Sequence, residues 1–474
     1  MNTSVHLISL GCARNDVDSE ELAARLDQDG FCLVDDPDAA EVIMVNTCGF
    51  IEQAKKDSID TLLAASDHKS SGRAKAVVAV GCMAERYGTE LAEALPEADA
   101  VLGFDAYPKI AGKLKSLLDG NRLGSHTPVD RRTLLPAAPN ARQDLVSAIV
   151  PGHSGIANLP TGLAPASGPR VLRRRLHTGP FAPLKIASGC DRRCAFCAIP
   201  SFRGSYLSRP IDEIVTEARW LASQGVREVM LVSENTSSYG KDLGIRHPLP
   251  TLLERLSDIE GLEWIRVSYV QPAEITPDML TAITSTEKVV PYFDISFQHA
   301  SQRVLRRMRR FGDPESFSKL LGGIREAAPN AGVRSNFIVG FPGEEPEDVE
   351  ILADFICNAA FDAAGVFAYS DEEHTEGASL DGHVEVEEIA QRYARIAQLI
   401  DEVCDQRAAE RVGERVTVLA ESLDDQGVVG RAAHQGPEVD GTTTLLNSTA
   451  AVGQFVDALV VDSIGVDLLA RTVD

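Results

Sequence analysis

The chain reads LKIASGCDRRCAFC from Leu184 to Cys197, so that a short apolar run leads directly into three closely spaced cysteines. Cys190, Cys194 and Cys197 follow the pattern C-x3-C-x2-C. A structural zinc site needs a fourth protein ligand. A 4Fe–4S cluster held by three cysteines keeps one iron free for a substrate or cofactor, and thiolates suit such clusters. The run therefore predicts an iron–sulfur site, with a zinc knuckle or incidental cysteines as the less favoured alternative.

Strand and helix patterns alternate around this run, from residue 184 to about residue 404, with helical periodicity at Ile211–Gln224 and Glu347–Asn358. The predicted strands are Leu184–Ala187, Glu228–Val232, Trp264–Tyr269, Tyr292–Phe297, Val333–Val339 and Gly365–Tyr369. Six such units predict a partial (β/α)6 barrel with its chemistry at the C-terminal ends of the strands, where the cysteine run lies. Cys357 and Cys404 fall in helical patterns and are expected in the core.

Residues 1–118 form a second alternating segment, which predicts an open α/β sheet of parallel strands. Its predicted strands are Val5–Leu10, Val42–Val45 and Ala76–Val80. Cys12, Cys48 and Cys82 each follow the C-terminal end of one of these strands, and such ends meet at one edge of a parallel sheet. We expect the three thiolates to converge there and hold a second cluster; the alternative is three buried cysteines that act as small hydrophobes. Cys32, at a strand start, is expected to be structural.

Two further segments complete the domain organisation. Residues 119–183 are expected to be a linker, because the stretch from 134 to 183 is rich in Pro, Gly, Ser and Ala without sustained periodicity. Residues 405–474 change to short β-runs separated by Gly, Asp and Asn turns, which predicts a small antiparallel β-barrel. The central barrel is therefore expected to span residues 184–404.

Composition narrows the function classes. The 474 residues carry a net charge of −24, which is unfavourable for a dedicated nucleic-acid binder and suits a basic partner. No run of 18 apolar residues and no charged leader is present, so neither a membrane span nor a signal peptide is expected. Nine cysteines, six of them in motif-like positions, fit the reducing cytoplasm better than a disulfide framework.

The two cysteine triplets and the C-terminal β-barrel together resemble the radical S-adenosylmethionine (radical SAM) methylthiotransferases, over nearly the whole chain except the linker. The resemblance implies two 4Fe–4S clusters and S-adenosyl-L-methionine (AdoMet) as cofactors. It implies that the free iron of the barrel cluster chelates AdoMet, which is cleaved to a 5′-deoxyadenosyl radical. It also implies that the N-terminal cluster handles sulfur, and that the terminal barrel, called TRAM, grips the substrate.

Two branches of this family compete. One modifies an adenosine in transfer RNA, and the other, the RimO branch, methylthiolates the β-carbon of an aspartate in the twelfth small-subunit ribosomal protein. The strings SLGC at 9–12, NTCGFI at 46–51, FQHAS at 297–301, YSDEE at 369–373 and GPEVDG at 436–441 resemble the second branch. Residues 405–474 contain five basic and twelve acidic residues, whereas an RNA-gripping barrel should be cationic. We therefore favour the ribosomal protein over transfer RNA as the substrate. A non-catalytic iron–sulfur scaffold would need neither the six-strand barrel nor the β-module.

Contacts to AdoMet are expected near the strand ends of the barrel. The candidates are Glu234, Asn235, Gln298, Arg334 and Gly340, with Arg203 and Tyr206 near the mouth. The pair Glu234-Asn235 stands where the family is expected to carry Gln-Asp, and His374 and Gly377 replace an expected Gly-Thr-Pro-Ala pattern.

The expected partners follow from charge and chemistry. An acidic terminal barrel should bind a basic loop of the ribosomal protein, through acids such as Glu438 and Asp440. Deleting residues 405–474 should then cost protein modification more than AdoMet cleavage. An electron donor such as a flavodoxin or a ferredoxin is also implied.

Overall fold

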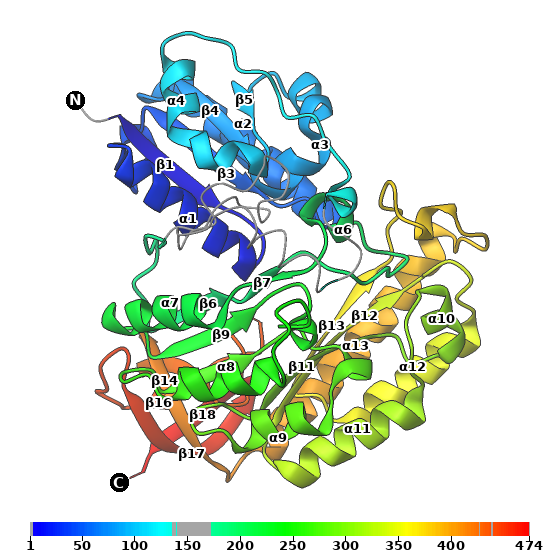
Figure 1. The fold of residues 1–474 in the computed structure, drawn as a ribbon. Coiled ribbons are helices and arrows are strands. Elements are labelled where there is room, and N and C mark those ends of the chain that lie inside the picture. The colour runs from blue at the N-terminus through cyan, green and yellow to red at the C-terminus, as the bar shows by residue number, and fades with distance from the viewer. Residues whose placement is uncertain (1–2, 135–138, 140–171, 426, 438, 474) are drawn as a thin grey trace.

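The computed structural model describes residues 3–134, 139, 172–425, 427–437 and 439–473 (Figure 1). Three parts follow one another along the chain: an α/β sheet, a central β/α barrel and a small closed β-barrel (Figure 1). Within the predicted linker, residues 135–138 and 140–171 lie outside the described residues. None of the described helices combines the length and hydropathy that crossing a membrane requires.

The N-terminal part is a parallel five-stranded sheet in the order β2-β1-β3-β4-β5, which confirms the predicted open α/β fold. Its strands are β1 (Ser4–Ser9), β2 (Cys32–Leu33), β3 (Val42–Thr47), β4 (Ala76–Val80) and β5 (Ala100–Val101), and its helices are α1 (Ala13–Gln28), α2 (Glu52–Ser71), α3 (Gly81–Ala94) and α4 (Ile110–Leu118). Every residue of β3 and β4 is buried, because helices cover both faces of the sheet. Cys32 begins an edge strand, as predicted, but its side chain is exposed.

The central part contains the six predicted parallel strands. They are β6 (Phe181–Lys185), β9 (Glu228–Val232), β10 (Trp264–Val267), β11 (Tyr292–Gln298), β12 (Gly332–Val339) and β13 (Ala363–Ala368). They form two three-stranded sheets, β6-β9-β10 and β11-β12-β13, joined by parallel bridges at Ile265–Val289 and Val270–Ile295. The arrangement is an open, partial barrel, as predicted.

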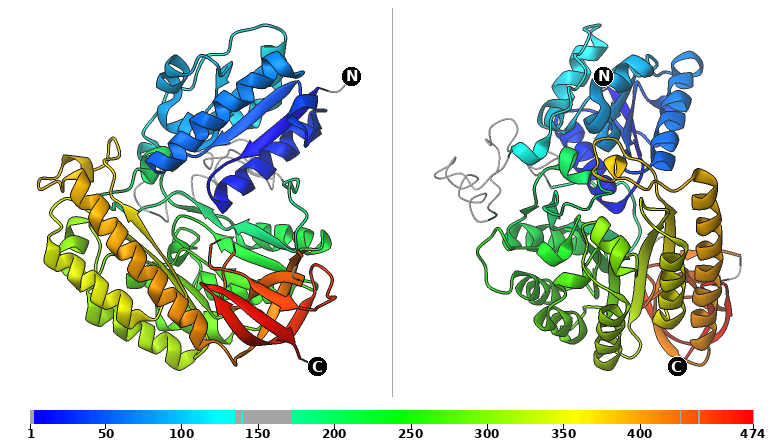
Figure 2. Two further views of the ribbon diagram at one scale, coloured as in Figure 1. Left: turned by 180° about the vertical axis from the view of Figure 1, so that it is seen from behind. Right: turned by 90° about the vertical axis from the view of Figure 1, so that its right-hand side faces the viewer.

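Helices pack around the outside of this barrel (Figure 2). They are α7 (Ile211–Ser223), α8 (Pro248–Ser257), α9 (Pro277–Ser285), α10 (Gln302–Arg307), α11 (Pro314–Ala327), α12 (Pro346–Ala359) and α13 (Val386–Glu410). Cys404 is buried on α13, as predicted, whereas the prediction for Cys357 is wrong: it lies on the exposed side of α12. Helical periodicity places a residue on a helix, but does not by itself decide which face a lone cysteine occupies.

The C-terminal part is a closed barrel in the order β14-β15-β16-β18-β17. Its strands are β14 (Arg415–Leu423), β15 (Gly427–Ala432), β16 (Thr443–Leu446), β17 (Phe455–Ile464) and β18 (Asp467–Thr472). All neighbours pair antiparallel except β16 and β18, which are parallel. Five strands cannot close with antiparallel neighbours throughout, since strand direction would have to alternate around an odd number.

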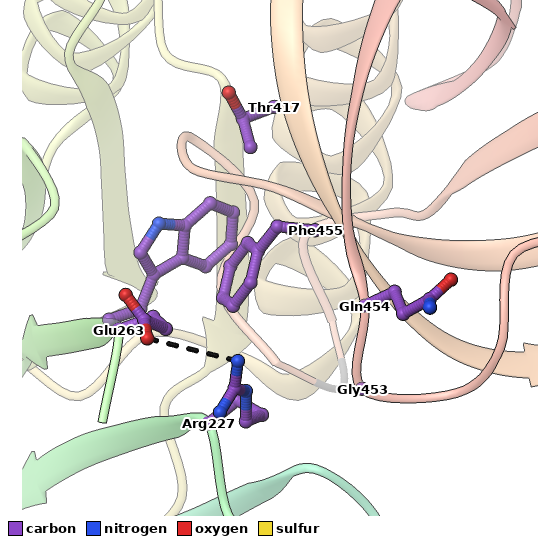
Figure 3. Close-up of a pocket in the computed structure, with 7 residues that line it drawn as sticks. Arg227, Glu263, Thr417, Gly453, Gln454 and Phe455 are labelled. Atoms are coloured by element: carbon purple, nitrogen blue, oxygen red, sulfur yellow. Dashed lines mark ion pairs between the residues drawn. The ribbon is translucent and has the colours of Figure 1, made fainter. Parts of the chain in front are cut away.

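This small barrel packs against the N-terminal ends of the central strands. Gly332, which begins β12, lies so close to His434 that an added Cβ would be 2.4 Å from its carbonyl oxygen. The rings of Trp264 and Phe455 meet edge to face with their centroids 4.9 Å apart, and both line a pocket at this junction (Figure 3). The N-terminal sheet lies at the other end of the central barrel, so the two outer parts occupy opposite ends (Figures 1 and 2).

Candidate functional site

The structure brings the three N-terminal cysteines to one edge of their sheet. Cys12 precedes α1, Cys48 follows β3, and Cys82 is the second residue of α3. The loops approach closely at Gly11 (φ +99°), where an added Cβ would lie 2.9 Å from Cys48 Sγ. A side chain at this position would fill the space that the Cys48 thiol occupies, so glycine is needed here.

One polar side chain, Asn15, connects the three cysteine loops. Its Nδ2 donates to Leu10 O at 2.7 Å and to Thr47 O at 3.2 Å, and its Oδ1 accepts from Cys82 Sγ at 3.6 Å. The sequence reasoning missed this residue. The sequence feature that could have pointed to Asn15 is its position three residues after Cys12, on the helix face that packs on the sheet.

The second cysteine run forms a compact turn above the central barrel. A short hairpin of β7 (Ala187–Ser188) and β8 (Leu207–Ser208) closes it, together with helix α6 (Ile199–Arg203). Within the turn, Cys197 N donates to Cys194 O at 3.1 Å, and Cys190 N donates to Gly204 O at 3.0 Å. All three cysteines are partly buried. A small pocket beside Cys194 is lined by Arg192, Gln271, Pro272, Ala273, Arg309, Arg310 and Phe311.

The spacing of the cysteine sulfurs distinguishes a single metal ion from a larger cluster. Zinc holds thiolates at about 2.3 Å, so ligating sulfurs lie within about 4.6 Å of one another. Among the described residues, no three cysteine sulfurs lie within 4.8 Å of each other. In each cysteine triplet the sulfurs are too far apart to bind one zinc ion together. Three such thiolates fit a larger iron–sulfur core in which each thiolate binds a different iron.

Burial makes these thiols hard to ionise without a metal. It raises the pKa of Cys82 to about 12 and, reinforced by the Cys194 thiol, that of Cys197 to about 12. Thiols with such values remain protonated at neutral pH, so a metal must displace their protons when it binds.

The two cysteine sites face each other across a buried charged seam. Arg14 of α1 donates from Nη1 to Ser233 O at 2.8 Å and stacks over the ring of Tyr269, 5.1 Å from its centroid. Glu234 Oε1 lies 3.7 Å from the Nε atoms of both Arg14 and Arg203. Beyond burial and the neighbouring thiols, Glu234 also raises the pKa of both Cys190 and Cys197. Residues from both parts therefore separate the two sites.

The candidates Glu234 and Asn235 lie beside the cysteine run. The Glu234 side chain is 1% exposed, and neither of its carboxylate oxygens has a hydrogen bond. Asn235 donates to Ser238 Oγ at 2.8 Å and to Glu274 Oε2 at 2.9 Å, while its buried Oδ1 has no partner. These unsatisfied buried oxygens are the kind of acceptor that a bound cofactor satisfies.

The other three candidates have different surroundings. Gln298 ends β11 in a left-handed conformation (φ +71°) and is half-buried. Gly340 (φ +79°) packs against α13, where an added Cβ would meet Ile389 Cγ1 at 2.5 Å. The Arg334 Nε lies 3.3 Å from Asp440 Oδ1 of the small barrel. The structure therefore accounts for Gly340 and Arg334, at least in part, by packing between elements.

The expectation that Asp440 meets a protein substrate is wrong. Asp440 is 4% exposed, accepts a hydrogen bond from Tyr292 Oη and accepts another from Gly436 N at 3.0 Å. It satisfies polar groups where the two barrels join, and a buried carboxylate of this kind is inaccessible to a partner protein. Glu438, the other acid named for this role, lies outside the described residues.

Comparison with known proteins identifies each part of the chain. Residues 4–103 match the Uncharacterized protein family UPF0004, residues 184–356 match the Radical SAM superfamily, and residues 412–473 match the TRAM domain. A "Ribosomal protein uS12 methylthiotransferase RimO" from Cutibacterium acnes is 63% identical over 470 residues, covering 99% of this chain and 98% of that protein. The proteins of the same name from Kineococcus radiotolerans and Streptomyces coelicolor are 60% and 58% identical, over 99% of this chain and 97% and 96% of their own lengths.

Among solved structures, the chain is similar to the radical S-adenosylmethionine methyltransferase TsrM from Kitasatospora setae, with a TM-score of 0.52 and 15% identity. The similarity covers 78% of this chain and 72% of that one. At this identity it supports the fold alone.

Proposed function

Because the chain belongs to the RimO family of ribosomal protein uS12 methylthiotransferases, we propose that it transfers a methylthio group to the β-carbon of an aspartate in uS12. The observation that carries this proposal is the pair of three-cysteine sites, one on each side of a buried seam. Two cofactor sites on either side of one buried seam suit a reaction that needs both a radical and a sulfur group.

Each cysteine triplet is proposed to hold one 4Fe–4S cluster: Cys190, Cys194 and Cys197 in the central barrel, and Cys12, Cys48 and Cys82 in the N-terminal sheet. When bound, the barrel cluster and AdoMet supply a radical able to take hydrogen from an unactivated carbon, and the second cluster supplies sulfur. The chain itself fixes the distance between the two sites and excludes water from the seam, through the buried contacts of Arg14, Arg203 and Glu234.

Among the proposed AdoMet contacts, Glu234 and Asn235 have the strongest support, since both present buried oxygens without a hydrogen bond beside the cysteine run. A carboxylate and an amide oxygen are suitable acceptors for the ammonium or hydroxyl groups of AdoMet. Gln298 is proposed as a further contact from the end of β11. Gly340 and Arg334 have weaker support, because Gly340 packs against α13 and Arg334 pairs with Asp440 of the small barrel.

The domain boundaries are proposed at 1–118, 119–183, 184–404 and 405–474. The substrate is proposed to be a basic loop of uS12 that reaches the cysteine sites in the cytoplasm, and the electron donor to be a flavodoxin or a ferredoxin. The net charge of −24 supports a basic protein partner. Transfer RNA is not favoured, since the relatives that span the whole chain carry the name of a uS12-modifying enzyme.

Mass spectrometry of a deletion strain tests this function. We expect the methylthio group to disappear from uS12, and to return when the wild-type gene is restored, while modified adenosines in transfer RNA stay unchanged. A strain with normal uS12 and altered transfer RNA would contradict the proposal.

A further inference from the structure

Arg203 connects the barrel to a cysteine of the other part of the chain. It ends α6, six residues after Cys197, and its guanidinium reaches across the seam. Its Nη2 lies 3.1 Å from Cys82 Sγ and 3.1 Å from Asp18 Oδ2. Arg203 is 5% exposed, so this contact is shielded from solvent.

The surroundings of Arg203 imply more than a packing role. Asp18 also pairs with Lys185, and Glu234 also lies 3.7 Å from Arg14. Both acids therefore retain a cationic partner if Arg203 is replaced. Cys82, by contrast, would lose the hydrogen bond that Arg203 donates to its sulfur from the barrel.

We propose that Arg203 is a positioning residue that tunes the reduction potential of the N-terminal cluster from the barrel side of the seam; this rests on the proposed role of Cys12, Cys48 and Cys82 as cluster ligands. A donor to a ligating sulfur withdraws electron density, and a buried cation stabilises an added electron, so both effects raise the potential. The low dielectric of the seam strengthens the effect of the charge.

A matched arginine serves the other site. Arg310 Nη1 lies 3.8 Å from Cys194 Sγ, while its Nη2 donates to Ser296 O. Arg310 belongs to the barrel and contacts its own cysteine run. It therefore provides a control of the same chemistry near the other cluster.

The test isolates one cluster at a time. Protein in which Cys190, Cys194 and Cys197 are all changed to Ala is reconstituted anaerobically, its iron is counted, and the remaining cluster is titrated potentiometrically by EPR. Adding Arg203→Gln should leave the iron count unchanged and shift the potential to a more negative value. Arg203→Lys, which keeps the charge, should give a smaller negative shift, and Arg310→Gln should give none.

The opposite parent protein, with Cys12, Cys48 and Cys82 changed to Ala, keeps the barrel cysteines. In this protein only Arg310→Gln should shift the potential of the remaining cluster. Unchanged potentials in Arg203→Gln protein would overturn the inference. If Arg203→Gln fails to fold or to bind iron, Arg203→Lys decides: a negative shift supports the inference, and a wild-type potential overturns it. Absence of iron from the parent triple variant would instead refute the ligand assignment, so the two failures are distinguishable.

Discussion

Single residues far apart in sequence define the cysteine sites, and Asn15 and Arg203 illustrate how. The cysteines themselves were predictable, because each follows a strand that apolar periodicity reveals. Asn15 and Arg203 were harder to assign, since their function depends on hydrogen bonds to Thr47 O and Cys82 Sγ. Sequence spacing along one segment carries no information about such partners until the sheet and barrel are assembled.

His126 provides a titratable link between two carboxylates. Its Nδ1 lies 3.2 Å from Asp105 Oδ1 and its Nε2 lies 3.4 Å from Glu85 Oε2, so each ring nitrogen faces one acid. Burial opposes protonation, but these two acids prevail and raise the pKa of His126 to about 9. This geometry fits an imidazolium between two anions.

Stability should therefore depend on pH through His126. The folded-state pKa exceeds the unfolded value near 6.5, so the contribution is complete below about pH 6.5 and is lost as pH rises towards 9. We expect wild-type protein to lose about 2–3 kcal/mol of unfolding free energy over this interval relative to His126→Gln. Urea unfolding at several pH values measures it. Parallel pH profiles for the two proteins would contradict the ion triad.

Strand β15 and its connection to β16 help to join the two barrels. Glu228, which begins β9 and is fully buried, pairs with Arg266 at 2.7 Å and with Arg431 at 2.6 Å. Arg266 also donates to Ala433 O at 2.8 Å. The strand positions of Glu228 and Arg266 were predictable from the pattern, but not that Glu228 also pairs with Arg431, a residue 203 positions further along the chain.

Removing the central acid of this network should be costly. Glu228→Gln leaves the Arg266 and Arg431 charges buried with too little compensation, and we expect a loss of about 3 kcal/mol in unfolding free energy. Glu421→Gln is the matched control, because Glu421 pairs with the same Arg431 from a side chain that is 24% exposed. The control should cost less than about 1 kcal/mol. Equal losses in chemical denaturation would argue against the network.

The arrangement of the whole molecule separates the two outer parts. The N-terminal sheet covers the cysteine end of the central barrel, and the small barrel closes the opposite end (Figure 1). Sequence patterns predicted the three folded parts and their order along the chain. They did not predict which end of the central barrel each part covers, because that depends on side-chain contacts such as Arg334–Asp440.

This arrangement changes the expected effect of deleting the C-terminal barrel. Removing residues 405–474 would expose Glu228, Arg266 and Tyr292, which are buried beneath the barrel. We expect a lower Tm and a several-fold loss of AdoMet cleavage even without substrate, since the barrel that holds the cysteine run is destabilised. Measurement of deoxyadenosine and Tm for the truncated protein checks this. Unchanged cleavage at an unchanged Tm would restore the view that the small barrel serves only the substrate.

The most direct test of two separate cysteine sites is the anaerobically reconstituted variant in which Cys12, Cys48 and Cys82 are all changed to Ala. We predict about four irons per chain in place of about eight. We also predict continued conversion of AdoMet to deoxyadenosine, with no methylthio group added to uS12. A folded variant that keeps about eight irons, or one that still methylthiolates uS12, would contradict the account.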